Sequence, residues 1–79
     1  MQIRITKNEA NTLHVWMGEH LIADSTTFRR TRGFWNKVTQ THIQAPELTP
    51  KKVKQDPSLI RQALHQTGTT STLPIHVDF

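Results

Sequence analysis

Residues 13–25 read LHVWMGEHLIADS and contain the strongest local signal in the chain. Two apolar segments flank Gly18-Glu19, and a glycine at the first loop position is typical of a two-residue type II′ β-hairpin turn. This turn predicts the pairs Met17–His20, Trp16–Leu21, Val15–Ile22 and His14–Ala23. One face of the hairpin would carry Leu13, Val15, Met17 and Ile22, and the other would carry His14, Trp16, Leu21 and Ala23. Both faces are partly apolar, so one is expected to pack on a core and the other to need a different partner.

A further strand signal precedes the hairpin. Residues 2–6 alternate in polarity, with Ile3 and Ile5 on one face. Residues 7–12 contain two asparagines and no strongly apolar side chain, so we expect a loop there. The N-terminal third therefore predicts a three-stranded antiparallel meander.

Residues 34–43 are open to two interpretations. An extended structure is favoured by the β-branched residues Val38, Thr39, Thr41 and Ile43. A helix would place Phe28, Trp35, Val38 and His42 on one stripe. Gly33 argues against one continuous helix, so the extended interpretation is the one we adopt.

The C-terminal half contains one clear helix signal. Residues 45–55 hold two prolines and three lysines and predict a loop. A helix is expected over 57–66, with Asp56 as its N-cap and Gly68 at its C-terminal cap. Residues 67–72 resemble a flexible linker in composition, and residues 73–79 alternate like a strand near a sheet edge. The chain thus predicts an α+β fold, with a small antiparallel sheet of three to five strands and one amphipathic helix packed on it.

The composition describes a single small basic domain covering residues 1–79. Ten Lys and Arg against six Asp and Glu give a net charge of +4, and there is no cysteine. The missing cysteines exclude a disulfide scaffold, a Cys-ligated zinc module and a thiol enzyme. No segment approaches the ~20 apolar residues of a membrane-spanning helix, and no secretory signal is visible, so we expect a cytoplasmic protein with no membrane partner. A core this small is marginal, and homodimerisation is one way to enlarge it.

Residues 28–35, FRRTRGFW, interleave three arginines with three aromatic side chains. Guanidinium groups bind phosphate through paired hydrogen bonds, and aromatic rings stack on unpaired bases. We therefore predict binding to RNA or single-stranded DNA, with basic residues on the phosphates and Phe34 or Trp35 stacking. The predicted nucleic-acid-binding residues are Arg29, Arg30, Arg32, Phe34, Trp35, Lys51, Lys52 and Lys54. Because the chain has only five aromatic residues, the core is expected to include Phe28 and one of Phe34 and Trp35.

The sequence contains no recognisable catalytic constellation. Three Asp and three Glu form no acid–base pair or triad, and the five histidines lack the spacing of a metal site. We therefore expect a non-enzymatic protein with no metal, no cofactor and no catalytic residues.

Two alternatives stay open. A small chain without an active site also fits a phage- or plasmid-type inhibitor, such as an anti-CRISPR-like antagonist, that binds an acidic surface of a host protein complex. Its predicted protein-interface residues are Trp16, His20 and Leu21, since Trp beside an aliphatic residue is typical of an interface hot spot. The second alternative is a toxin-like ribonuclease that uses a histidine.

Overall fold

The computed structural model describes the backbone of residues 1–79 and every side chain except that of Phe28. The expectation that Phe28 belongs to the core therefore lies outside the described side chains. The elements in chain order are β1 (Ile3–Lys7), β2 (Leu13–Met17), β3 (His20–Phe28), β4 (Thr31–Asn36), β5 (Thr41–Gln44), α1 (Pro50–Gln55), α2 (Ser58–Gln66) and β6 (Ile75–Val77).

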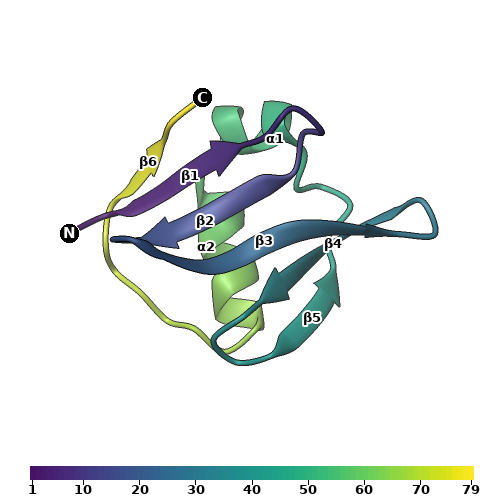
Figure 1. Cartoon of the computed structure of the whole chain (residues 1–79). Coiled ribbons are helices and arrows are strands. Elements are labelled where there is room, and N and C mark those ends of the chain that lie inside the picture. The colour runs from purple at the N-terminus through teal and green to yellow at the C-terminus, as the bar shows by residue number, and fades with distance from the viewer.

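The strands form one sheet of six strands in the order β5-β4-β3-β2-β1-β6 (Figure 1). Strands β1 to β5 form an antiparallel meander, and β6 pairs in parallel with β1. The α+β prediction is confirmed in outline. The sheet is larger than the three to five strands expected and is mixed, because the chain crosses from β5 through two helices to the opposite edge before it forms β6.

The β2–β3 hairpin turns where the sequence predicted. Gly18 has a φ of +63°, which glycine adopts without a steric penalty, and Met17 pairs with His20 across the turn. The predicted register is wrong beyond the Trp16–Leu21 pair, because a bulge makes Ile22 an extra residue on β3. The bulge turns Ala23 into the core, where it is fully buried, instead of onto the outer face.

The extended interpretation of residues 34–43 is confirmed, and the helical alternative is wrong. These residues form β4 and β5 with a turn over 37–40 between them. Phe34 pairs with Ile43, and Trp35 pairs with His42. Alternation along β4 buries Phe34 and leaves Trp35 half-buried on the other face, so one of the two aromatics joins the core as predicted.

The loop prediction for residues 45–55 is wrong in its second half. Thr49 caps α1 by accepting a hydrogen bond from the Lys52 backbone N–H, and Pro50 occupies the first turn, where its missing N–H does no harm. Val53 is the buried residue of this short helix. A single buried position gives no helical periodicity, so the sequence pattern could not reveal the helix.

Helix α2 begins one residue later than predicted and ends where predicted, and its N-cap is Pro57 rather than the expected Asp56. The Asp56 carboxylate accepts a hydrogen bond from the Ser58 backbone N–H. At the other end Gly68 has a φ of +97°, its N–H bonds to the His65 carbonyl, and the Thr69 N–H bonds to the Leu64 carbonyl. These two bonds form a Schellman motif, which ends the helix at a glycine.

The two helices cover one face of the sheet, which Figure 1 shows from the opposite side, with α2 crossing behind β2 and β3. The buried core lies between the layers and contains Ile3, Ile5, Leu13, Val15, Ile22, Ala23, Phe34, Ala45, Leu48, Val53, Ile60, Ala63 and Leu64. The second sheet face carries no helix of this chain, and we call it the open face.

Residues 67–72 are held in place, contrary to the flexible linker expected from their composition. The buried side-chain amide of Asn36 donates to the hydroxyl oxygens of Thr67 and Thr69, at 2.9 and 2.8 Å. The Arg61 guanidinium donates to the carbonyl oxygens of Ser71 and Leu73. These bonds guide the chain to β6 at the sheet edge, where a strand was predicted.

Candidate nucleic-acid interface

A row of four side chains runs across the open face from β2 to β5. Strand pairing sets His14 opposite Asp24, Asp24 opposite Trp35, and Trp35 opposite His42. Directly paired residues of antiparallel strands project from the same face, so these four side chains are neighbours. The row combines one carboxylate, two imidazoles and an indole.

Trp16 forms a second aromatic position on the open face, next to β1. Its indole N–H donates to the Thr6 hydroxyl oxygen at 2.8 Å, and the Arg4 guanidinium carbon lies 5.6 Å from the ring centroid. Arg4 also forms an ion pair with Asp78 at 3.4 Å. Trp16 is half-buried by these contacts, so part of its ring stays accessible on a face that no helix covers.

The tip of the β3–β4 hairpin consists of Arg29 and Arg30, and Figure 1 shows this hairpin projecting beyond the rest of the sheet. Arg29 has a φ of +53° and Arg30 a φ of +66°, and both residues are exposed. Positive φ at both central residues is the pattern of a type I′ turn, which favours Asn-Gly. Arginine has a Cβ and is disfavoured in this conformation, so the tip is locally strained.

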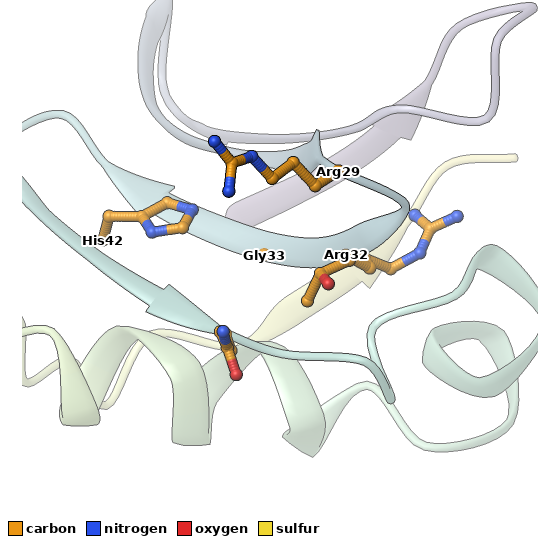
Figure 2. Close-up of a pocket in the computed structure, with 6 residues that line it drawn as sticks. Arg29, Arg32, Gly33 and His42 are labelled. Carbon is orange, nitrogen blue, oxygen red and sulfur yellow. The ribbon is translucent and has the colours of Figure 1, made fainter.

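A hollow of about 270 Å³ opens beside this hairpin on the open face. It is lined by Arg29, Thr31, Arg32, Gly33, His42 and Gln44, and none of these described residues carries a carboxylate. The His42 Nε2 atom lies 2.9 Å from the Thr26 hydroxyl oxygen, which fixes the imidazole over Gly33. Figure 2 shows Arg29 reaching across the hollow towards His42, whereas the Arg32 side chain points away from it.

The structure does not bring all of the predicted nucleic-acid-binding residues together in one place. Arg29 and Arg30 are at the hairpin tip, and Trp35 is on the open face. Phe34 is only 1% exposed, so the prediction that it could stack on a base is wrong, whereas Trp35 is half-buried on the open face. Arg32 is half-buried on β4, an inner strand of the sheet, and alternation points its side chain to the opposite face from Gly33.

The lysine segment lies apart from Trp35. Lys51, Lys52 and Lys54 are exposed on α1, which belongs to the helical layer rather than to the open face. Lys54 Nζ lies 5.9 Å from the centroid of the Phe79 ring. The two basic segments therefore do not form one continuous patch around Trp35.

The predicted protein-interface residues lie at the opposite end of the β2–β3 hairpin from the arginines. His20 and Leu21 line an open groove of about 500 Å³, together with Met1, Met17, Ile22, Lys37 and Val38. Val38 is 66% exposed, which is high for an apolar side chain. Trp16 is paired with Leu21 and so adjoins the groove without lining it.

Sequence reasoning missed Arg4, Asp24 and His42 as members of the open face. Each is an isolated polar residue in its own segment, and only strand pairing brings it beside a tryptophan. In the sequence Gly33 argues against a helix, although a glycine inside a strand can also mark a close approach of another group.

Within the residues that the structure describes, no group of three or more His, Cys, Asp and Glu side chains is placed to hold a metal ion. The helices of the described chain are also too short and too polar to cross a membrane. A scan against protein-family models, a search of curated proteins and a search of solved structures each found no match. The function therefore has to be inferred from the site itself.

Proposed function

We propose that this protein is a non-enzymatic binder of RNA or single-stranded DNA, and that the strand lies along the open face beside the β3–β4 hairpin. The observation that carries the proposal is that Arg29 and His42 line one hollow on the open face, and that Trp35 pairs with His42 beside it. Arginine supplies phosphate contacts, and an accessible indole supplies a stacking surface for a base.

Single-stranded nucleic acid fits this surface better than a duplex does. Stacking on Trp35 needs an unpaired base, which a duplex does not offer. The projecting β3–β4 ribbon could still enter a duplex groove, so duplex DNA is the comparison in the test. In this proposal Arg30 and Arg32 add phosphate contacts at the hairpin. Lys51, Lys52 and Lys54 raise the positive potential from the helical layer, where they speed encounter with a polyanion rather than fix its register.

The test is fluorescence anisotropy with labelled dodecamers of uridylate and of deoxythymidylate at 50 and 200 mM salt, with duplex DNA as the comparison. Three phosphate contacts predict a slope of about −2 for log affinity against log salt, or a loss of roughly 20-fold over this range. Trp35→Ala should lower the affinity, and Trp35→Phe should retain most of it because a ring remains. No binding at 50 mM salt would refute the proposal.

The second candidate is an antagonist that binds a host protein complex. It is supported by the apolar groove that contains His20 and Leu21, in which exposed Val38 adjoins Lys37. Such a groove fits a partner with an apolar side chain flanked by a carboxylate. A partner captured from nuclease-treated lysate by the wild type, and lost with Leu21→Glu or Val38→Glu, would favour this candidate over nucleic acid.

The same RNA probe also tests the ribonuclease alternative. Prolonged incubation followed by gel analysis should leave the uridylate dodecamer intact. Cleavage that disappears in His42→Ala would instead favour the enzyme, because His42 is the histidine of the arginine-lined hollow.

A further inference from the structure

We infer that the hollow over Gly33 is a binding site for one internucleotide phosphodiester, with the base of the adjoining nucleotide on Trp35. This inference rests on the proposed function and assigns its phosphate contact to one place.

The floor of the hollow is the buried Gly33 backbone, against which the His42 imidazole rests. A Cβ added there would lie 2.5 Å from His42 Nε2 and 2.9 Å from the Ile43 carbonyl oxygen, both too close. Gly33 is not among the residues with positive φ, so its conformation alone does not require glycine. A glycine inside a strand weakens the strand and often marks a close approach, and here the approaching group is the His42 imidazole, which the missing side chain of Gly33 lets sit beside the hollow.

The walls of the hollow are hydrogen-bond donors with positive character. Arg29 contributes a guanidinium from the strained hairpin tip, and His42 contributes an imidazole positioned by Thr26. Thr31 and Gln44 add a hydroxyl and an amide. Asp24, the carboxylate of the neighbouring row, is paired with Trp35 and not with Gly33, so it does not occupy the hollow.

A phosphodiester matches this lining in charge and in size. It is a monoanion whose two free oxygens suit the planar fork of a guanidinium. A hollow of about 270 Å³ is at the small end for a site that encloses a whole organic ligand, and its volume suits a phosphate with part of its sugar. Because Trp35 pairs with His42, an aromatic surface lies one strand position away, where the attached base can stack.

The experiment is an NMR titration of the ¹⁵N-labelled protein with three probes. These are the dinucleotide UpU, its uncharged methylphosphonate analogue and inorganic phosphate. UpU should shift the Gly33 amide, the His42 ring and the Trp35 indole, whereas the analogue should shift the indole alone. Inorganic phosphate should shift Gly33 and His42 but leave Trp35 unmoved, which separates a nucleotide strand from a free anion as the ligand.

Variants extend the test to affinity for the uridylate dodecamer. Arg29→Ala should weaken binding about tenfold, as expected for loss of one charge-assisted contact, and Arg29→Lys should recover part of the loss. Lys7→Ala removes the same charge from β1, three strands from β4, and should change affinity less than twofold. Gly33→Ala should also weaken binding by displacing His42. If Gly33→Ala does not fold, the comparison of Arg29→Ala with Lys7→Ala still tests the site.

Three outcomes would overturn the inference, and they differ in what they say of the proposed function. If the dodecamer binds the wild type but Arg29→Ala and Lys7→Ala behave alike, the hollow is not the phosphate site, although the protein still binds nucleic acid. If neither the dodecamer nor UpU binds the wild type, both the inference and the proposed function fail. Equal shifts of Gly33 by UpU and by its uncharged analogue would also refute a phosphate contact.

Discussion

Replacing Arg29 with Asn and Arg30 with Gly should stabilise the fold and weaken the binding of nucleic acid at the same time. The two arginines are the central residues of a two-residue turn between Phe28 and Thr31, with φ values of +53° and +66°. A turn with positive φ at both positions favours Asn followed by Gly, because Asn tolerates this region and Gly has no Cβ to clash.

The expected gain follows from the strain at the two positions. A residue with a Cβ loses roughly 1–2 kcal/mol in the left-handed region. For Arg30→Gly the gain in stability is reduced by about 0.5–1 kcal/mol, because glycine raises the conformational entropy of the unfolded chain. The double variant should therefore gain about 1 kcal/mol of unfolding free energy, which corresponds to a rise in Tm of roughly 4–8 °C for a domain of this size.

Thermal unfolding followed by circular dichroism measures the gain, with Arg29→Lys/Arg30→Lys as the control. The lysine variant keeps both Cβ atoms and both charges, so its Tm should match that of the wild type. Loss of two phosphate contacts should flatten the salt slope for the uridylate dodecamer by about 1.4. A Tm that is unchanged or lowered in the Asn-Gly variant would refute the strained turn, whatever the binding data show.

Three further changes test other parts of the structure. Asn36→Ala should lower the unfolding free energy by about 3 kcal/mol in urea titrations, because this fully buried amide bonds to two threonine hydroxyls and two backbone N–H groups, whereas exposed Asn8→Ala should lose only about 1 kcal/mol. Asp24→Asn should raise dodecamer affinity about twofold to fivefold, because it removes a negative charge beside Trp35 that repels the phosphates. A fall in affinity would mean that the nucleic-acid strand does not cross the open face at Asp24. Phe34→Ala should destabilise by about 3–5 kcal/mol, while Trp35→Ala should reduce binding with a smaller loss of stability; equal losses in urea would contradict their assignment to opposite faces.

Local signals were enough for the parts of the fold that depend on neighbouring residues. Gly18 marked the hairpin turn, and Asp56 and Gly68 marked the ends of the longer helix. Each of these residues acts within a few positions of itself, through a dihedral angle or a capping bond. Such interactions are present in the sequence before any tertiary contact forms.

Features that depend on distant contacts were not predictable in the same way. The bulge at Ile22 shifts the hairpin register by one residue, and no residue type in the local sequence predicts a bulge there. Helix α1 buries a single residue, Val53, so it has no apolar stripe to detect. The sixth strand finds its place only because Ile3, Ile5 and their neighbours on β1 offer a free edge to Ile75 and Val77.

The candidate site illustrates how much one residue of register matters. The arginine and aromatic content of residues 28–35 singled out this segment, but alternation along β4 buries Phe34 and leaves Trp35 half-buried on the other face. A sheet reverses every side chain when its register slips by one. Composition could therefore nominate the segment, whereas only strand pairing could divide its residues between core and surface and bring His42 beside them.

The segment from Arg29 to Trp35 combines several choices that weaken a small domain. Two arginines occupy left-handed positions, Gly33 interrupts a strand, and Trp35 leaves part of an indole uncovered. Arg29, Arg30 and Gly33 each lower stability by about 0.5–2 kcal/mol. The total stability of a chain of this length is expected to be roughly 4–12 kcal/mol. Elsewhere positive φ falls at Gly18, Gly68 and Asn11, which tolerate it, with Gln40 in the β4–β5 turn as a further exception. Natural sequences break such rules mainly at functional sites, so the concentration of unfavourable choices beside one arginine-lined hollow supports a binding role for that corner, independently of its charge.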